Sequence, residues 1–151
     1  MLRVLGTKPI RMARMIILDN SVLVAFTEPT DSHHIRAKNI LKTNVKNRFA
    51  HCETIAEYLV HPIRRGTAEL SWDFLTGPYN NGNLGITVLD APIPPNGEPW
   101  PIHLARVRAE TRLKMPDAVV LATALAIGGK VATFDDGLAA AADSYSALFS
   151  E

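Results

Sequence analysis

A short apolar run that ends on a carboxylate constrains this chain more than any other feature. The run "MIIL", residues 15–18, has the length and the β-branched centre of a buried strand, and Asp19 follows it directly. A charged group that is buried without a partner loses several kcal/mol of hydration or more. Asp19 at the end of a buried strand therefore needs partners, and other parts of the chain must supply them.

Strands and helices are predicted to alternate along the rest of the chain. Further strands are expected in "RFAH", at the end of "GNLGITVLD", in "KVATF" and in "YSALF". Helices are expected in "SVLVAF", "SHHIRAKNILK", "TAELSWDFLT", "HLARVRAETRLK", "PDAVVLATALAI" and "LAAAA", and from Cys52 to Ile63. This alternation favours an α/β fold with a central, mainly parallel sheet flanked by helices.

Two of these helices show an apolar face in their spacing. From Cys52 onward, apolar residues recur three and four positions apart, which is the pattern of an amphipathic helix. The residues expected on that face are Ile55, Ala56, Leu59, Val60 and Ile63. In the preceding helix, Ile35, Ile40 and Leu41 are expected on the buried side.

The composition describes an ordinary globular chain and excludes several classes of protein. With 151 residues the chain has room for one domain with a real core. The net charge of +1 points to no partner, and the single cysteine, Cys52, excludes an internal disulfide and a multi-cysteine zinc site. No apolar run is long enough to span a membrane, so we expect a protein of the cytoplasm with no membrane partner.

The domain is expected to begin near residue 15. The first 14 residues carry four basic side chains, but the apolar run behind them is too short for a signal peptide. They are therefore expected to be a flexible basic extension, or the product of a misassigned start with Met12 or Met15 as the true first residue. Residues 15–151 would then form the single domain.

Carboxylates from four predicted elements can meet at one edge of such a sheet. Asp19 and Asp135 each follow a predicted strand, and the carboxyl ends of parallel strands line one edge where ligands bind. Asp117 lies in the first turn of the helix that Pro116 opens, and Glu53 and Glu57 share one face of another helix. Several carboxylates cannot ionise side by side without a counter-charge, and oxygen ligands alone suit Mg²⁺ or Mn²⁺.

Each acid also has an ordinary structural role when it is taken alone. Asp19 could be a turn residue or a helix cap, and Asp117 could complement a helix dipole. Glu57 could be an exposed helix residue, and Asp135 and Asp136 before Gly137 look like any strand–turn junction. Spacing makes a shared metal site possible without deciding it.

Three blocks of the sequence resemble a known family. They are "IILDNSVLVA", "TIAEYLVHPIRRG" and "LKMPDAVVLATALAIGGKVATFDDGLAAAA", and together they cover nearly everything from Met15 onward. In order and spacing they resemble PIN-domain proteins of the VapC type, the toxins of bacterial toxin–antitoxin pairs. "PDAVVLATAL" followed by "TFDD" is the most specific part of the match.

The resemblance implies a PIN-like fold, a function and a set of site residues. It implies a ribonuclease, a hydrolase of RNA phosphodiester bonds that depends on Mg²⁺ or Mn²⁺. Its four acidic positions, both catalytic and metal-ligating, fall on Asp19, Glu57, Asp117 and Asp135. Ser21, Thr133 and Asp136 are expected around these acids, while Asn20 departs from the Thr or Ser that usually follows the first Asp.

The resemblance also implies partners. A cognate antitoxin protein is expected, together with an RNA substrate and a homodimeric state. The basic side chains that could track an RNA backbone are Arg64, Arg65, Arg112 and Lys114, although a solvated helix surface accounts for them nearly as well.

Other functions fit the sequence less well. A phospho-aspartate phosphatase also begins with an Asp after its first strand, but it needs a second acid two positions later, where this chain has Ser21. A receiver domain would need paired acids before the first helix. The remaining alternative is a PIN-like module that binds RNA or protein without catalysis, and the presence of all four acids argues against it.

Overall fold

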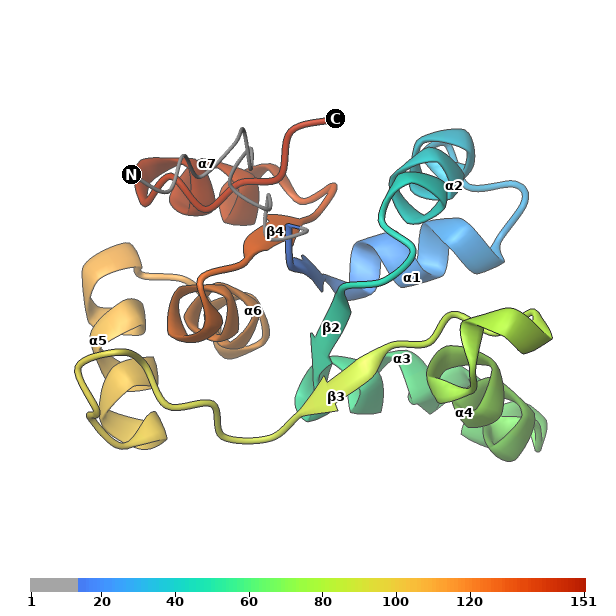
Figure 1. The fold of residues 1–151 in the computed structure, drawn as a ribbon, viewed down its shortest axis with the longest axis horizontal. Helices are drawn as coiled ribbons and strands as arrows, with labels where there is room; N and C mark the ends of the chain where they lie inside the picture. Colours follow the sequence, from blue (N-terminus) through green and yellow to red (C-terminus); the bar gives the residue numbers. More distant parts are fainter. Residues whose placement is uncertain (1–13) are drawn as a thin grey trace, which may run out of the picture.

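Four short parallel strands form the centre of the fold, in the spatial order β3-β2-β1-β4 (Figure 1). The central strand β1 pairs with β2 on one side and β4 on the other, so that Ile17 lies opposite both Phe49 and Val131. The strands are β1 (Ile16–Leu18), β2 (Arg48–His51), β3 (Thr87–Leu89) and β4 (Lys130–Ala132). The computed structural model describes residues 14–151. The predicted extension therefore lies outside the described residues apart from Arg14, and the division at residue 15 stays a prediction.

The residues of β1 serve both faces of the sheet. Successive side chains of a strand point to opposite sides. Accordingly, Ile16 and Leu18 belong to one hydrophobic cluster, Ile17 belongs to another, and all three are completely buried. Burial on both faces is typical of a parallel sheet, and it explains why this strand has no polar alternation in its sequence.

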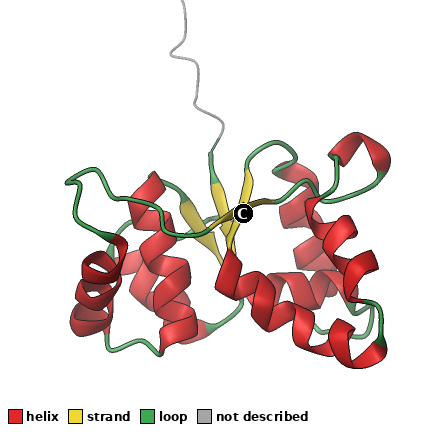
Figure 2. Ribbon diagram, turned by 90° about the horizontal axis from the view of Figure 1, so that it is seen from below, coloured by secondary structure: helices red, strands yellow, loops and turns green. Residues whose placement is uncertain are grey.

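Helices cover both faces of the sheet, as Figure 2 shows with the strands between two helical groups. The first cluster contains buried side chains of α1 to α4, and the second contains buried side chains of α5 to α7. The helices are α1 (Asn20–Thr27), α2 (His34–Thr43), α3 (Cys52–Arg65), α4 (Ala68–Thr76), the short 3₁₀ helix η1 (Tyr79–Asn81), α5 (Trp100–Thr111), α6 (Met115–Ile127) and α7 (Asp136–Ser144). The predicted α/β class with a parallel sheet and flanking helices is confirmed.

Helix α6 begins and ends as its sequence predicts. Pro116 lies in its first turn, where a missing N–H costs nothing because that group has no helical partner. Gly128 ends the helix with φ 72°, a left-handed conformation that glycine adopts without strain. Gly129 then lets β4 start close to β1, because a Cβ at this position would lie 2.8 Å from Cδ1 of Ile17.

Several side chains expected in the core are exposed. Ile35 is 67% exposed and Ile63 is 64% exposed, whereas Ile55 on the same predicted face as Ile63 is 2% exposed. In α3 the buried residues are Thr54 and Ile55, so burial is confined to the start of this helix. The predicted last strand in "YSALF" is reduced to one parallel bridge between Val131 and Leu148.

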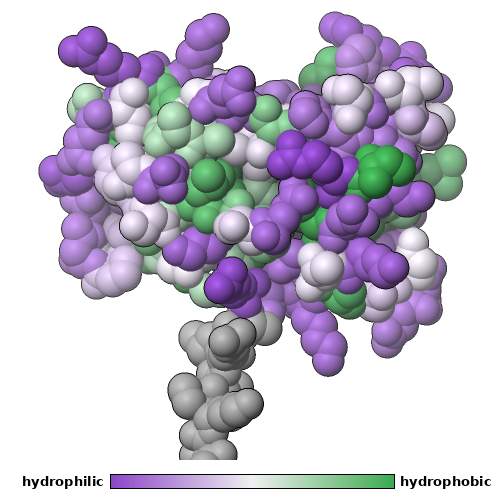
Figure 3. Space-filling model, turned by 90° about the horizontal axis from the view of Figure 1, so that it is seen from above, coloured by the Kyte–Doolittle hydropathy of each residue, from purple (hydrophilic) through white to green (hydrophobic). Residues whose placement is uncertain are grey.

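The surface is polar over most of the face seen in Figure 3, where hydrophobic side chains appear in small separate groups. Among residues 14–151, no helix has both the length and the apolar character that a bilayer crossing requires.

Candidate active site

Asp19 joins β1 to α1 and is held by three hydrogen bonds. Its Oδ1 accepts from the backbone N–H of Asn20 at 2.8 Å, which makes Asp19 the N-cap of α1. Its Oδ2 accepts from two hydroxyls, Ser21 Oγ and Thr133 Oγ1, each at 2.7 Å. The side chain is nearly buried, at 7% exposure, and these donors compensate the hydration that it loses.

The two hydroxyls tie the β4–α7 turn to the start of α1. Thr133 Oγ1 accepts from the backbone N–H of Asp135 at 3.0 Å, and Ser21 Oγ accepts from the backbone N–H of Phe134 at 3.0 Å. The two hydroxyl oxygens lie 3.4 Å apart. Ser21 and Thr133 therefore lie around the acids, as expected, and they fix the backbone that carries Asp135.

Asp135 and its neighbour Asp136 have different positions. Asp135 is the N-cap of α7, and its Oδ1 accepts from the backbone N–H of Leu138 at 2.8 Å. Asp136 is exposed in the first turn of that helix. The hydrogen bonds that Ser21, Thr133 and the other acids make within residues 14–151 do not include Asp136.

Asp117 and Glu57 are carried by two helices, α6 and α3. Asp117 is half-buried in the first turn of α6. Glu57 lies in the second turn of α3, and its Oε1 accepts from Asn20 Nδ2 at 2.9 Å. A cavity of about 110 Å³ separates the two helices here, lined by Glu53, Thr54, Glu57, Met115 and Pro116. No pattern in the sequence indicates the contact between Asn20 and Glu57, which are 37 positions apart.

The charges of the other three acids act on Asp117. Burial raises the pKa of its carboxyl above the ordinary value of 3.8, and the negative charges of Asp135, Asp19 and Glu57 raise the pKa further. Lys114, at the N-cap of α6, lowers it and only partly compensates. The fold thus brings together the four carboxylates that the sequence singled out.

The donor chemistry of this site fits a hard divalent cation. Its members are carboxylate oxygens, which Mg²⁺ and Mn²⁺ prefer, and no histidine or cysteine is needed. The Oδ1 atom of Asn20, the residue bonded to Glu57, is buried and has no hydrogen-bond partner among the described residues. Among residues 14–151, however, no three His, Cys, Asp or Glu side chains are already arranged closely enough to hold a metal ion. The acids supply suitable ligands, but they do not form a complete coordination site in this arrangement.

The predicted RNA-contacting cations lie at helix ends. Arg64 and Arg65 are exposed in the last turn of α3, and Arg112 ends α5 with a left-handed φ of 60°. The positive charge of Lys114 lowers the pKa of Asp117.

A stacked group lies beside the acids and has no signature in the sequence. The ring of His33 stacks on that of Phe134, with centroids 4.5 Å apart, and the guanidinium of Arg36 lies 5.1 Å from the Phe134 centroid. Phe134 sits between Thr133 and Asp135 in the sequence. No local pattern joins residues so distant along the chain.

Comparisons with known proteins match most of the chain. The family model described as "PIN domain" matches residues 16–144. No curated protein matches the sequence. Among solved structures, VapC20 of Mycobacterium tuberculosis, a sarcin–ricin-loop-cleaving toxin, is 15% identical with a TM-score of 0.59, and the match covers 83% of this chain and 94% of that one.

Two further solved structures are similar. FitAcB of Neisseria gonorrhoeae is 22% identical with a TM-score of 0.61, over 85% of this chain and 94% of that one. A toxin–antitoxin complex of Klebsiella pneumoniae contains a chain 18% identical with a TM-score of 0.58, over 80% of this chain and 86% of that one. At these identities the likeness shows a shared fold.

Proposed function

Because this chain belongs to the PIN-domain family, we propose that it is a ribonuclease, a hydrolase that cleaves RNA phosphodiester bonds with Mg²⁺ or Mn²⁺. One observation carries the proposal. Asp19, Glu57, Asp117 and Asp135 come from four parts of the chain, and the charges of the other three act together on Asp117. A protein gains nothing in stability from packing like charges around a half-buried acid, so a function explains the arrangement better than folding does.

The chain's own residues have distinct roles in this proposal. A divalent cation bound here would stabilise charge on the phosphate oxygens and lower the pKa of a water. Asp19, Asp117 and Asp135 would hold the cation, and Glu57 would hold it or orient the water. Ser21 and Thr133 keep Asp19 in one orientation through their bonds to Oδ2.

The RNA backbone would be guided by basic side chains outside the cleft. We propose Arg64, Arg65, Arg112 and Lys114 for this role, since each lies at a helix end and all four are exposed. Substitution of these residues should weaken RNA binding with little effect on the chemical step.

We further propose that the protein is the toxin of a type II toxin–antitoxin pair. The support is the fold shared with VapC20 and with a chain of a toxin–antitoxin complex. The cognate antitoxin would block the acidic cleft, for example by placing an arginine among the carboxylates, where a bidentate pair forms readily. Since the proposed substrate is cellular RNA, the proposed place of action is the cytoplasm.

A homodimer is part of the same proposal. Val60 and Ile63 on α3 and Leu70 and Trp72 on α4 are large apolar side chains that are at least 41% exposed. Apolar groups clustered on two neighbouring helices support an interface between copies of the chain. Sedimentation equilibrium of the wild type and of Ile63→Lys measures whether this surface holds a dimer together.

The experiment that tests the function is RNA cleavage with controlled metal. Purified protein should cleave RNA in Mg²⁺ or Mn²⁺ and stop in EDTA, and activity should return when the metal is restored. Asp19→Asn should be inactive under all conditions, whereas Asp143→Asn, an equal charge change at an exposed residue of α7, should be active. Cleavage that persists in EDTA would refute the metal-dependent mechanism. Metal binding without cleavage of any RNA would favour the non-catalytic alternative.

A further inference from the structure

Three side chains beside the four acids form a stacked group to which the proposed mechanism gives no role. The ring of His33 lies nearly parallel to that of Phe134, with the centroids 4.5 Å apart and the planes at 12°. The guanidinium of Arg36 lies 5.1 Å from the centroid of the Phe134 ring. We call these three residues the aromatic platform. Histidine and phenylalanine rings and the plane of an arginine are groups on which proteins stack unpaired RNA bases.

The aromatic platform is fixed to the acids through Phe134. This residue lies between Thr133 and Asp135, and its backbone N–H donates to Ser21 Oγ at 3.0 Å. The same hydroxyl donates to Oδ2 of Asp19 at 2.7 Å. Hydrogen bonds therefore connect the platform to one acid of the site, and the chain connects it to another. A nucleotide that adjoins a phosphate held at these acids is placed to meet the platform.

The ring nitrogens of His33 are available for a ligand. His33 is the N-cap residue of α2, but its side chain does not cap the helix. Within residues 14–151 neither of its ring nitrogens makes a hydrogen bond, and neither is a buried atom without a partner, so both are open to solvent. Its neighbour His34 differs, because Nδ1 of that ring is bonded to the carbonyl of Ala25 at 2.8 Å. His33 therefore offers a donor and an acceptor at the surface.

Arg36 is held by an exposed ion pair that a phosphate can replace. Its Nε donates to Oε1 of Glu151 at 3.1 Å, and its Nη2 lies 3.0 Å from the same oxygen. The two side chains are 57% and 43% exposed, and an ion pair as exposed as this contributes little to stability. A phosphate oxygen can therefore take the place of the Glu151 carboxylate at small cost. Arg36 adds a phosphate contact to the aromatic surface.

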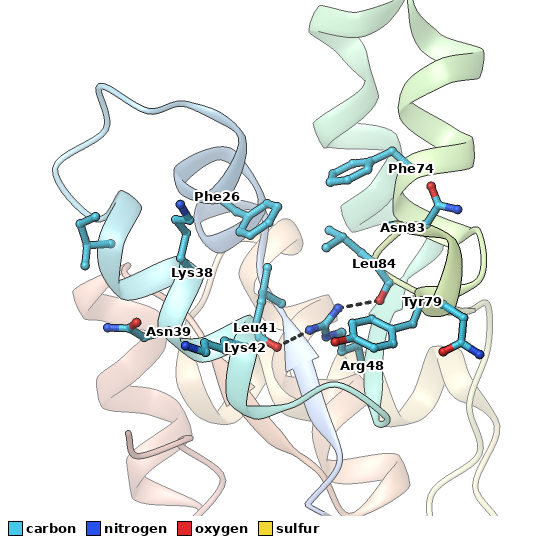
Figure 4. A pocket seen from close by; sticks show the side chains of 13 residues that line it. Phe26, Lys38, Asn39, Leu41, Lys42, Arg48, Phe74, Tyr79, Asn83 and Leu84 are labelled. Carbon is cyan, nitrogen blue, oxygen red and sulfur yellow. Dashed lines mark hydrogen bonds between the residues drawn. The ribbon is translucent and has the colours of Figure 1, made fainter.

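The aromatic platform is separate from a cavity of about 810 Å³ that lies along another side of α2 (Figure 4). Lys38, Asn39 and Lys42 of that helix line the cavity, whereas none of the three platform residues does. Arg36 and Lys38 are two positions apart, so their side chains leave the helix about 200° from each other. Residues of the cavity wall can therefore serve as controls for the platform.

We propose that the aromatic platform binds an unpaired base of the RNA substrate next to the bond that is cleaved. The base stacks against the ring of His33, which Phe134 holds in place, and a ring nitrogen of His33 bonds to the edge of the base. Arg36 binds the phosphate that adjoins this base. The proposal rests on the proposed function, because it assigns a further part of the same RNA site. His33 and Arg36 are then substrate-binding residues, and Phe134 is a positioning residue.

Two probes of equal charge separate base contacts from backbone contacts. One is a fluorescein-labelled oligoadenylate of about ten nucleotides, and the other is a ribose-phosphate strand of the same length without bases. Fluorescence anisotropy of the full chain in Ca²⁺, with gels to confirm that the strands stay intact, measures both dissociation constants. His33→Ala should weaken oligoadenylate binding about tenfold, which is typical of one lost base stack, and should leave binding of the abasic strand unchanged. Unchanged oligoadenylate binding, or an equal loss for both strands, would overturn the proposal.

Further variants test whether the base stacks on the ring of His33. His33→Phe keeps a ring and should recover most of the affinity that His33→Ala loses. Phe134→Leu removes the ring that supports His33 and should weaken oligoadenylate binding, with urea midpoints to show that the variant is folded. Tyr79→Ala removes a ring that is 49% exposed at the cavity of Figure 4, and it should change nothing. A His33→Phe variant as weak as His33→Ala would contradict stacking, and an equal loss in Tyr79→Ala would show that any exposed ring binds RNA.

Arg36→Gln tests the phosphate contact. It should weaken binding of the oligoadenylate and of the abasic strand by a similar factor, about threefold to tenfold, because both strands carry the phosphate. Arg106→Gln is the matched control, since Arg106 is also 57% exposed and also paired with one glutamate, Glu98. If Arg106→Gln weakens binding as much as Arg36→Gln, the effect is one of general charge and the assignment of Arg36 is wrong.

Cleavage kinetics distinguish a failure of this proposal from a failure of the proposed function. If the protein cleaves RNA in Mg²⁺, His33→Ala should raise KM with little change in kcat, because it removes binding that the ground state and the transition state share. Cleavage with a KM that His33→Ala leaves unchanged would refute the platform alone. A protein that cleaves no RNA, yet binds the oligoadenylate through His33, would refute the ribonuclease and support the base-binding site.

Discussion

Thr133 Oγ1 donates a 2.7 Å hydrogen bond to Asp19 Oδ2, between residues 114 positions apart in the chain. Asp19 follows the central strand β1 and Thr133 follows its neighbour β4. The bond therefore joins the carboxyl ends of adjacent parallel strands, at the edge where ligand sites form in such sheets. It holds a nearly buried carboxylate in one orientation, and it positions the backbone that leads to Asp135.

Loss of the Thr133 hydroxyl should destabilise the protein. Thr133→Val preserves the shape and removes a donor to a buried carboxylate, which should lower the free energy of unfolding by about 1–3 kcal/mol. Thr133→Ser keeps the hydroxyl and should retain most of the stability. Urea unfolding measures the difference, with Thr43→Val as a control because that exposed hydroxyl bonds only to its own helix and to Asn44. A Thr133→Val variant as stable as the wild type would show that this bond contributes nothing.

Asp19→Asn should relieve toxicity in cells without unfolding the protein. Expressed alone, the wild type should arrest bacterial growth, because RNA cleavage is unopposed. The Asn variant loses one ligand charge, and a loss of about two orders of magnitude or more in cleavage rate is expected. Growth curves, with protein levels and circular dichroism as controls, measure the outcome. An Asn variant that is folded and as toxic as the parent would separate toxicity from the acidic site.

Asp135 and Asp136 should respond differently to the same substitution. Asparagine is as good an N-cap as aspartate, so Asp135→Asn should keep the bond to the Leu138 N–H and leave α7 intact. It should nevertheless abolish cleavage because the charge near Asp117 is removed. Asp136→Asn should retain most activity. The two variants are compared by their RNA-cleavage rates at saturating Mg²⁺. A loss of activity in Asp136→Asn alone would mean that the metal ligand is assigned one residue too early.

The raised pKa of Asp117 predicts how stability depends on pH. The folded protein holds this proton more tightly than the unfolded chain, whose pKa is near 3.8. Stability from this group is therefore greatest at low pH, falls as pH rises between 3.8 and the raised folded pKa, and stays reduced above it. Without divalent metal, Asp117→Asn should be more stable than the wild type at about pH 7.5, and this advantage should shrink toward about pH 4.

Mg²⁺ should make the wild type more stable than Asp117→Asn, which reverses their order of stability in EDTA. Mg²⁺ binds the folded wild type and stabilises it by mass action, whereas Asp117→Asn lacks one ligand and should gain less. Urea midpoints at both pH values, in EDTA and in Mg²⁺, measure both effects. If the wild type is more stable than Asp117→Asn in EDTA at about pH 7.5, the negative charges around Asp117 do not destabilise the folded protein, and this prediction is wrong.

Elements with local signals were predictable from the amino-acid sequence alone. The apolar run of β1, the proline and glycine that bound α6, and the alternation of strands and helices all depend on neighbouring residues, and the structure confirms them. The four acids could be listed from the sequence, but spacing left their roles open, and the resemblance to PIN-domain proteins selected them. Because parallel strands end at the same edge of a sheet, Asp19 and Asp135 could be expected to lie near each other. Glu57 and Asp117 lie on helices, and the folded chain was needed to place them in the same region.

The contacts between side chains that are distant in the sequence could not be predicted and were seen only in the tertiary structure. Several contacts join residues that no periodicity in the sequence connects. Asn20 donates a hydrogen bond to Glu57, and the ring of His33 stacks on that of Phe134. The guanidinium of Arg48 donates to the backbone carbonyl of Leu84, 36 positions away. Ile35 and Ile63 had the spacing of core residues and are exposed, because burial depends on whether another element lies opposite a helix face. Helical spacing fixes which residues share a face, but the packing of the whole chain decides how much of that face is covered, and in α3 the buried residues are Thr54 and Ile55 near its start.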